Sequence, residues 1–554
     1  MDPVIKNPAI KKMATSIGSY DYIIIGGGTA GCVLANRLSS DPGIKVLMLE
    51  AGGKDNYMWI HIPVGYLHCI GNPRTDWCFR TEPEPGLNGR SIGYPRGRVL
   101  GGSSSINGMI YMRGQRRDFE HWQALGNPGW GWDDVLPYYK RSEDYARGAD
   151  EMHNTGGEWR VEQQRLSWEI LDAFRDAAAE VGIPKVTDFN RGNNEGCGYF
   201  EVNQKRGVRW NAAKGFLRPA LDRPNLKVVT HAPVRRLRFA GKRVIGVEFW
   251  QGDQLCEADA NLETLLAAGA VSSPQILQCS GIGPVALLQQ HGIPVIHELP
   301  GVGENLQDHL QLRMAFKVKN TRTLNETAGS LLGRLGMGLE YLLFRSGPLS
   351  MSPSQLGAFV RSDDSQPTPN LEYHVQPLSL DKFGDPLHDF PAFTASVCDL
   401  HPESRGHIRI KSADSRVAPL IQPNYLSTEG DRQMAAAALR LTRRIVAAPA
   451  LQRFAPQEFK PGPALQSDEE LVRAAGDIGT TIFHPSGTCK MGNAADTLAV
   501  VDAQLRVHGI AGLRVVDASI MPTILSGNTS SPVVMFAEKA SDMIREDRKQ
   551  GEIA

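Results

Sequence analysis

A strand, a glycine-rich turn, a helix and a second strand follow one another near the start of this 554-residue chain. Residues 21–25 (DYIII) are a compact apolar run, and residues 26–31 (GGGTAG) come directly after it. Residues 32–38 (CVLANRL) predict a helix, and residues 45–49 (KVLML) predict a second buried strand that ends at Glu50. This order is that of a βαβ unit, which pairs its two strands in parallel and packs the helix on them.

The glycines of the turn predict a dinucleotide site. Gly26 permits the tight turn, Gly28 lets the backbone approach a pyrophosphate, and Gly31 lets the helix and strand pack closely. The helix N-terminus offers free N–H groups and partial positive charge to the phosphates. Glu50 lies 19 positions after Gly31, the spacing of an acid that accepts from a ribose 2′-hydroxyl and disfavours NADP. A glycine-rich turn without a ligand is the alternative.

A second glycine-rich stretch occupies residues 97–108 (GRVLGGSSSING). Gly101 and Gly102, followed by three serines, allow the backbone to lie flat against a diphosphate and a broad planar ring. A flexible surface linker is the alternative, but the apolar neighbours Val99, Leu100 and Ile106 disfavour it. The first glycine pattern does not by itself separate FAD from NAD. The second stretch helps to separate them, because its backbone suits a broad planar ring.

Charge and cysteine content exclude several classes of protein. Lysine plus arginine equals aspartate plus glutamate at 60 each, so no basic excess indicates nucleic acid as a partner. Charged residues make up 22% and hydrophobic residues 41%, as expected of a folded globular protein. The eight cysteines are scattered without a CxxC pair, which predicts reduced thiols in a cytoplasmic protein and no metal site.

The sequence predicts neither a cleaved export signal nor a spanning helix. Residues 1–20 carry three lysines and no apolar core, and no run of 18 apolar residues follows. We expect a cytoplasmic protein, with peripheral contact at the inner membrane left open. The first residues, about 18 of them, are expected to form a loose extension.

The remainder of the chain predicts a second, antiparallel part. Residues 53–94 are irregular and rich in proline, glycine and tryptophan. Strand-like pieces at 317–320 (KVKN), 371–376 (LEYHVQ) and 407–411 (HIRIK), among loops between 315 and 425, predict an antiparallel sheet. Further predicted strands are at 226–230, 244–249, 264–268 and 513–516, and predicted helices at 167–181, 433–447, 467–475 and 532–544. Because cofactor-type elements occur at both chain ends, the domains are expected to be discontinuous.

Several long motifs, in order, resemble those of the glucose–methanol–choline (GMC) oxidoreductases, with bacterial choline dehydrogenase-like and alcohol dehydrogenase members most similar. The resemblance runs from about residue 20 to residue 544. The motifs lie at 97–120, 269–283 (GAVSSPQILQCSGIG), 301–309 (GVGENLQDH), 404–414 (SRGHIRIKSAD), 484–492 (HPSGTCKMG) and 515–521 (VVDASIM).

The resemblance implies an α/β fold in which a Rossmann-like FAD-binding domain is interleaved with an α+β substrate domain built on an antiparallel sheet. Relatives that link FAD covalently carry a histidine where this chain has Ile106, so the resemblance implies non-covalent FAD. The implied divisions are an extension at 1–19, an FAD-binding domain at 20–314 with a cover near 53–94, a substrate domain at 315–495, a return to the FAD-binding domain at 496–545 and a tail at 546–554.

The resemblance also implies the reacting residues. His484 aligns with the family's catalytic histidine, and a histidine base suits removal of an alcohol proton near neutral pH. Asn528 aligns with the second catalytic position, where its amide would orient the substrate oxygen; capping of the final helix is the alternative. The expected cofactor contacts are Gly26, Gly28, Thr29, Ala30, Gly31, Glu50, Arg98, Gly101, Gly102, Ser103, Asn107, Gly108, Val234, Ala268, Asp517, Ala518, Asn528 and Thr529.

The expected activity is FAD-dependent oxidation of a primary alcohol to an aldehyde, with electrons passed to a quinone-type acceptor or to oxygen. Choline-oxidising relatives carry a glutamate near the substrate cation, whereas this chain has Gln311, so neutral aliphatic or aryl alcohols are preferred to choline. Other activities on the same fold are fatty acid photodecarboxylation, for which Cys398 aligns with a functional cysteine, and a non-redox lyase reaction. His484, which photodecarboxylases lack, favours alcohol oxidation.

Overall fold

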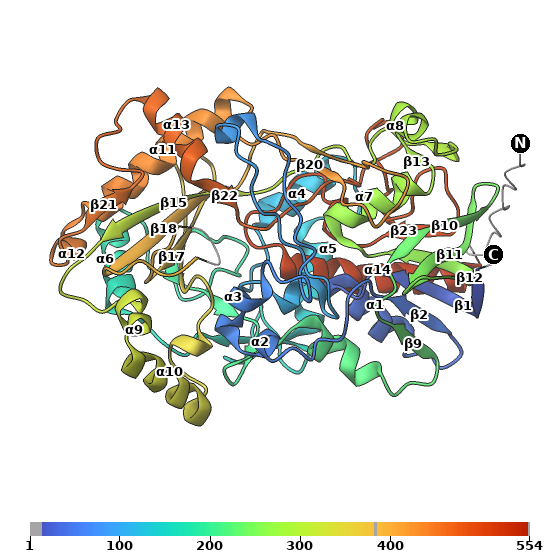
Figure 1. Cartoon of the computed structure of the whole chain (residues 1–554), viewed down its shortest axis with the longest axis horizontal. Helices are drawn as coiled ribbons and strands as arrows, with labels where there is room; N and C mark the ends of the chain where they lie inside the picture. Colours follow the sequence, from blue (N-terminus) through green and yellow to red (C-terminus); the bar gives the residue numbers. More distant parts are fainter. Residues whose placement is uncertain (1–13, 382–384, 552–554) are drawn as a thin grey trace, which may run out of the picture.

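The computed structural model describes residues 14–381 and 385–551, and it contains two seven-stranded sheets side by side (Figure 1). The first sheet has the strand order β10-β11-β12-β1-β2-β9, with β23 beside β12. Its strands are β1 (Thr15–Ile25), β2 (Val46–Leu49), β9 (Leu226–Val229), β10 (Val234–Ala240), β11 (Arg243–Gln251), β12 (Gln254–Leu266) and β23 (Leu513–Val515).

The centre of the first sheet is parallel, as the βαβ pattern predicts. β1 pairs in parallel with both β2 and β12, and its residues 22–25 are buried. Helices α1 (Thr29–Leu38) and α14 (Ser530–Gln550) pack against this sheet and against each other. The predicted final helix is therefore confirmed, and it brings the C-terminal part of the chain back to the first βαβ unit.

The N-terminal strand is longer than the sequence predicts, because β1 begins at Thr15 and not at residue 21. Residues 15–20 pair with residues 256–260 of β12, so the predicted loose extension is wrong for this stretch. The side chains there are mostly polar, but β12 offers a free strand edge whose backbone groups need partners. Residues 1–13 lie outside the described part of the chain.

The second sheet is antiparallel and has the order β21-β15-β18-β17-β16-β5, with β22 beside β15. Of the three predicted pieces, 371–376 is β17, 317–320 only overlaps the end of β15, and 407–411 overlaps β19 in a separate two-stranded sheet with β20. The strands of the second sheet are β5 (Gly196–Tyr199), β15 (Leu310–Lys317), β16 (Leu356–Val360), β17 (Leu371–Gln376), β18 (Ala392–Asp399), β21 (Gln457–Lys460) and β22 (Gly479–Thr481). The separate pair is β19 (His407–Arg409) and β20 (Leu420–Gln422).

The two faces of the second sheet differ in polarity. One face carries Tyr373, Val375 and Val397, which pack in one apolar core with the helices α6 (Glu169–Glu180), α11 (Glu429–Val446), α12 (Pro449–Gln452) and α13 (Asp468–Ile478). Because side chains alternate along a strand, the intervening positions point to the opposite face. Gln311, His374 and Gln376 lie at such positions, and all three line the cavity described below.

Several segments between the sheets hold short helices. Residues 53–94 contain only α2 (Met58–His61), α3 (Tyr66–Cys69) and single turns, in keeping with their irregular sequence, and Arg90 donates to two carbonyl groups at the end of α13. The region expected to alternate strands with loops also contains α9 (Leu324–Gly329) and α10 (Leu331–Phe344), which the sequence interpretation missed. No helix within the described residues is long and apolar enough to span a bilayer.

The remaining elements connect these layers. The helices are α4 (Arg116–Ala124), α5 (Trp132–Ser142), α7 (Gly269–Cys279) and α8 (Val285–Gln290). The remaining short strands are β3 (Glu143–Tyr145), β4 (Trp159–Gln163), β6 (Glu201–Val202), β7 (Gln204–Lys205), β8 (Val208–Arg209), β13 (Ile282–Gly283) and β14 (His297–Glu298). The mixed α/β fold class is confirmed, and strand β5 shows that the second sheet also uses chain from the N-terminal half.

Candidate active site

One long cavity begins at the first glycine turn, where β1 ends and α1 begins. A Cβ on Gly26, whose φ is +106°, would lie 2.4 Å from the carbonyl oxygen of Ala267, and one on Gly31 would lie 1.9 Å from that of Gly26. Larger residues would therefore push the strand and helix apart. Gly28 caps the helix without a side-chain bond, so the N–H groups of the first turn remain available toward the cavity.

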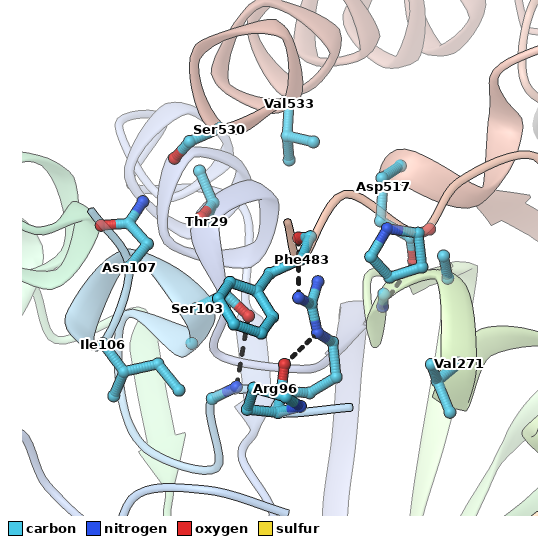
Figure 2. A pocket seen from close by; sticks show the side chains of 18 of the residues that line it. Thr29, Arg96, Ser103, Ile106, Asn107, Val271, Phe483, Asp517, Ser530 and Val533 are labelled. Atoms are coloured by element: carbon cyan, nitrogen blue, oxygen red, sulfur yellow. Dashed lines mark hydrogen bonds between the residues drawn. The ribbon is translucent and has the colours of Figure 1, made fainter. Parts of the chain in front are cut away.

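The second glycine stretch lies against the first. Residues 102–105 form a single 3₁₀ turn, and a Cβ on Gly102 would lie 2.7 Å from the Cα of Gly28. The backbone N–H of Gly97 donates to the hydroxyl of Ser103 over 3.2 Å, which holds the turn closed (Figure 2). Two stretches about 70 residues apart thus form one backbone-lined cradle.

Glu50 lies at the end of β2, on the cavity wall. Its carboxylate accepts from the backbone N–H of Gly27 over 2.8 Å and from that of Gly52 over 2.7 Å. Burial raises the pKa of Glu50 to about 7, although these two donors and the positive charge of Arg98 oppose the rise. An anionic or neutral Glu50 can accept from a ribose hydroxyl, which fits the role expected from its spacing.

Asp517 lies beyond the end of β23 and also lines the cavity (Figure 2). Its carboxylate accepts from the N–H of Gly269 over 2.9 Å and from the hydroxyl of Ser273 over 2.6 Å. Burial in the cavity wall raises the pKa of Asp517, and its hydrogen bonds oppose the rise.

Most of the expected cofactor contacts come together around this cavity. Among the described residues, the lining leaves out three of them, Gly31, Arg98 and Gly101. The guanidinium of Arg98 lies 4.9 Å from the ring centre of Trp77. Those that line it are Gly26, Gly28, Thr29, Ala30, Glu50, Gly102, Ser103, Asn107, Gly108, Val234, Ala268, Asp517, Ala518, Asn528 and Thr529.

The chemistry of the wall fits a flavin dinucleotide. The start of α14 points at the cavity, with Ser530 and Val533 in its lining (Figure 2). The side-chain oxygens of Asn528 and Ser530 are buried without a hydrogen-bond partner among the described residues. Buried polar atoms normally have partners, so a polar ligand is expected at this end. Ile106, at the position of the covalent link in some relatives, offers the ligand only an apolar side chain.

His484 is buried where the cavity meets the second sheet. Its Nε2 lies 3.1 Å from the Nδ2 of Asn528, and its Nδ1 lies 3.0 Å from the Nδ1 of His309. The sequence places these three residues far apart, and the fold brings them into one hydrogen-bonded row. Asn528 does not cap α14, because the cap position is Thr529, so the contact with His484 replaces the capping alternative.

The hydrogen-bond partners of His309 and His484 show which of their ring nitrogens carry protons. The Nε2 of His309 lies 3.2 Å from the carbonyl oxygen of Leu400, which can only accept, so this nitrogen carries a proton. In neutral His309 the Nδ1 is then an acceptor, and the Nδ1 of His484 must donate to it. The Nε2 of His484 is left with a lone pair that faces the amide of Asn528 and the cavity.

Asp308 holds the segment that carries His484. One of its oxygens accepts from the backbone N–H of His484 over 2.8 Å, and the other accepts from the hydroxyls of Thr481 and Tyr425. Sequence reasoning assigned no role to Asp308 or His309, although both lie in the motif at 301–309. Their partners are more than 90 positions away, so no local pattern could reveal these contacts.

The surroundings keep His484 neutral. Its pKa lies well below the usual value of 6.5, because burial disfavours the charged ring. The positive charge of Arg96 lowers the pKa further, and a proton on His309 or His374 would do the same. His484 therefore has an unprotonated Nε2 at neutral pH, which is what a proton acceptor needs.

The substrate end of the cavity is polar and free of carboxylates. Gln311 of β15 and His374 and Gln376 of β17 line it, together with His484. Among the described residues, the acids in the cavity lining are Glu50 and Asp517, both on the walls of the dinucleotide cradle. Nothing in this lining supplies a full negative charge to a substrate cation.

Comparisons with known proteins find relatives along nearly the whole chain. The "Alcohol dehydrogenase [acceptor]" of Pseudomonas putida is 41% identical over 95% of each chain. "Choline dehydrogenase, mitochondrial" of Homo sapiens is 41% identical over 95% of this chain and 90% of that protein. Among solved structures, pyridoxine 4-oxidase from "Mesorbium loti" has a TM-score of 0.87 at 32% identity, covering 95% of this chain and 99% of that one.

Family profiles match both halves of the chain. The N-terminal profile of the GMC oxidoreductases matches residues 20–311, and the C-terminal profile matches residues 402–537. These matches contain the glycine turn, Glu50, His484 and Asn528, which the structure gathers around one cavity. The chain belongs to the GMC oxidoreductase family, as its motifs predict.

Proposed function

We propose that this protein oxidises a neutral primary alcohol to an aldehyde with non-covalently bound FAD. The observation that carries the proposal is the unprotonated Nε2 of His484, 3.1 Å from Asn528 and facing the same cavity as the dinucleotide cradle. When bound, FAD supplies the ring that accepts the hydride from the alcohol carbon. The apolar side chain of Ile106 supports non-covalent attachment, because it has no group that could form a link.

His484 and Asn528 divide the work on the substrate hydroxyl. The Nε2 of His484 accepts the hydroxyl proton, and the amide N–H of Asn528 donates to the substrate oxygen as negative charge develops on it. His309 accepts from the Nδ1–H of His484 and so keeps the reactive nitrogen unprotonated. Asp308 fixes the backbone of His484, which holds the ring in place between its two partners.

The lining of the substrate end supports a neutral substrate over choline. Gln311 presents an uncharged amide, and it donates to the carbonyl of Thr481 over 3.1 Å. Relatives named choline dehydrogenase keep choline as the second candidate substrate. A quinone-type acceptor or oxygen would take the electrons onward, and the name of the Pseudomonas putida relative supports a separate acceptor.

Two other activities are less well supported. Cys398, which aligns with the functional cysteine of photodecarboxylases, is buried next to Glu372 and is not part of the cavity lining among the described residues. Burial and the nearby carboxylates raise the pKa of this thiol, so it stays protonated. A non-redox lyase would also use His484, but it would leave FAD oxidised in the presence of substrate.

A substrate panel tests the proposal. Aliphatic and aryl primary alcohols and choline would be compared by kcat/KM, with a dye acceptor and separately with oxygen. We expect neutral alcohols to exceed choline, and Gln311→Glu to raise choline turnover relative to neutral alcohols. Gln376→Glu provides a matched control at a second lining amide. Faster turnover of choline than of every neutral alcohol would contradict the proposed substrate class.

A further inference from the structure

Helix α10 carries an unusual amount of exposed apolar surface. In the described part of the chain, seven of the thirteen exposed large hydrophobic side chains belong to this one helix, and they are between 58% and 82% exposed. Tyr341 is its only buried residue. The seven side chains are Leu331, Leu332, Leu335, Leu339, Leu342, Leu343 and Phe344. A patch of this kind marks a surface that another phase or molecule covers.

The helix is attached to the body along one side, through Tyr341 and through Met337, which packs on an apolar cluster that includes Met351, and its other large apolar side chains remain free. The hydroxyl of Ser330 accepts from the N–H of Gly333 over 2.9 Å, which caps the first turn. Near the other end, the hydroxyl of Tyr341 donates to the carbonyl of Gly207 over 3.0 Å. Figure 1 shows α10 projecting from the lower edge of the molecule, away from both sheets.

The sequence of α10 also indicates that it needs a partner. Its fourteen residues include Gly333, Gly336 and Gly338, and each glycine costs about 1 kcal/mol of helix stability relative to alanine. An isolated helix of this length is marginal in water even with good helix formers. Burial of the seven apolar side chains would supply the missing stabilisation.

Basic residues surround the apolar helix. Arg334 and Arg345 lie on α10 or at its end, and Arg165 donates to the carbonyl of Phe344 over 3.4 Å. Lys205 and Arg206 precede Gly207, which the helix contacts through Tyr341. None of these five cations forms an ion pair within the described residues.

Of the three carboxylates near the helix, one is already paired with another cation. Glu340 accepts from the hydroxyl of Ser346 over 3.1 Å, and Glu162 accepts from Arg160 and from the backbone N–H of Arg206. Glu326 accepts from the backbone N–H of Thr323 at the start of α9. Glu340 and Glu326 keep their negative charge, so the border carries five cations outside ion pairs against two such carboxylates and is positive overall.

We propose that α10 docks on the surface of an anionic phospholipid bilayer. Exposed leucine and phenylalanine side chains bordered by cations, most of them from neighbouring segments, suit insertion into the membrane interface with the cations at the headgroups. The helix is too short to cross, so it lies along the surface. A symmetric pair of copies joined through α10 would bring two like-charged borders together, which favours lipid over a second copy.

The position of α10 connects this surface to the active site. After α10 the chain makes a short turn at residues 348–350 and reaches Pro353 and Ser354, both of which line the cavity. That turn contacts residues 63–65, which are followed directly by Tyr66, another lining residue. Docking through α10 would therefore place the substrate end of the cavity next to the lipid phase.

Vesicle flotation of the purified full-length flavoprotein tests the proposal. Vesicles of phosphatidylcholine alone are compared with vesicles that contain phosphatidylglycerol. We expect wild type to float with the anionic vesicles, and Leu339→Ser/Leu342→Ser/Leu343→Ser to lower the partition coefficient by roughly a hundredfold. Leu125→Ser/Leu221→Ser/Leu498→Ser removes the same number of exposed leucines elsewhere and should bind like wild type.

Charge-reversing substitutions and added salt test the basic border of the helix. Arg334→Glu/Arg345→Glu should lower binding to anionic vesicles, and added salt should weaken binding of wild type but not remove it. Wild type that does not float with anionic vesicles, or an α10 triple variant that floats equally well, would overturn the proposal. Self-association of wild type without lipid that the α10 variant abolishes would assign the helix to a second copy and overturn it too.

Discussion

The reactivity of His484 comes from the hydrogen bonds around its ring. The carbonyl of Leu400 fixes a proton on the Nε2 of His309, and this assigns every other proton of the row as far as Asn528. A histidine without such partners would exchange between two tautomers, and part of the population would present an N–H to the substrate. The arrangement holds the proton-accepting form ready before substrate binds.

Replacing His484 tests its role as the base. His484→Ala should lower kcat by about 10²- to 10⁴-fold, the usual contribution of a positioned proton acceptor. FAD content should not change, because the cradle lies along other segments of the chain. Steady-state kinetics and the flavin-to-protein absorbance ratio measure both effects. His291→Ala, outside the cavity lining, is the control, and unchanged turnover in His484→Ala would remove His484 from the reaction.

The lowered pKa of His484 predicts the pH dependence of activity. Protonation fills the lone pair of Nε2, so activity is complete above the pKa of His484 and is lost as the pH falls through it. Because burial and nearby positive charge hold this pKa well below 6.5, the acid limb of kcat/KM should lie well below pH 6.5. Thermal unfolding over the same pH range excludes loss by denaturation. An acid limb above pH 6.5 would contradict the assignment.

The residues of the site differ in how far the sequence reveals them. His484 begins the motif at 484–492 and Asn528 follows shortly after the motif at 515–521, so the resemblance alone points to both. His309 acts through a contact with a residue 175 positions away and through a carbonyl 91 positions away. No pattern of neighbouring residues encodes such contacts, since they exist only after two sheets and a connecting segment have come together.

At the scale of elements, the dinucleotide cradle depends on the contact of two glycine turns. Gly102 has a φ of +53°, and a Cβ there would lie 2.7 Å from the Cα of Gly28. The turn before α1 and the turn at residues 102–105 can approach this closely only without side chains. The sequence identified each stretch separately, but it did not predict that the two touch.

Gly102→Ala should therefore break the cradle. The added methyl group would separate the two turns, and we expect at least a tenfold loss of FAD affinity, which is about 1.4 kcal/mol. Gly89→Ala is the matched control, because Gly89 also has a positive φ, +79°, but has no atom within 4 Å of the added Cβ. FAD retained after gel filtration gives the comparison. Equal retention by both variants would show that close contact of the turns is not required.

Elements with a strong apolar pattern were predictable, and those without one were not. The strand at 21–25 is an apolar run that leads into a glycine turn, and the strand at 45–49 is an apolar run that ends at an acid. This order is that of a βαβ unit, so the sequence predicts that the two strands pair in parallel, as they do. Helix α10 was missed because glycines interrupt it and because no polar face gives it a helical period. β19 was assigned to the wrong sheet, because short strands do not encode their partner.

At the scale of the whole molecule, a buried charge cluster joins the two ends of the chain. Glu538 of α14 has a fully buried side chain and pairs with Arg37 of α1 over 2.6 Å and with Arg141 over 2.8 Å. Arg37 also pairs with Glu158 over 2.6 Å. Since α1 and α14 both begin at the cavity, this cluster holds the two helix N-termini in place around the cofactor site.

Removing the charge of Glu538 should destabilise the fold. Glu538→Gln leaves Arg37 paired only with Glu158 and Arg141 only with Asp542, and we expect a loss of about 2 kcal/mol in the free energy of unfolding. Asp176→Asn is the control, because its pair with Lys185 is half exposed and is worth less than about 1 kcal/mol. Urea denaturation at neutral pH measures both. A loss no larger than that of the control would show that the cluster does not hold the helices.

The most direct test of the account is anaerobic mixing of the purified flavoprotein with a neutral primary alcohol in the dark. The account predicts that the yellow absorption of FAD bleaches and that one aldehyde forms for each flavin. Absorption that stays unchanged with every alcohol tested, or product that forms only in light, would contradict it.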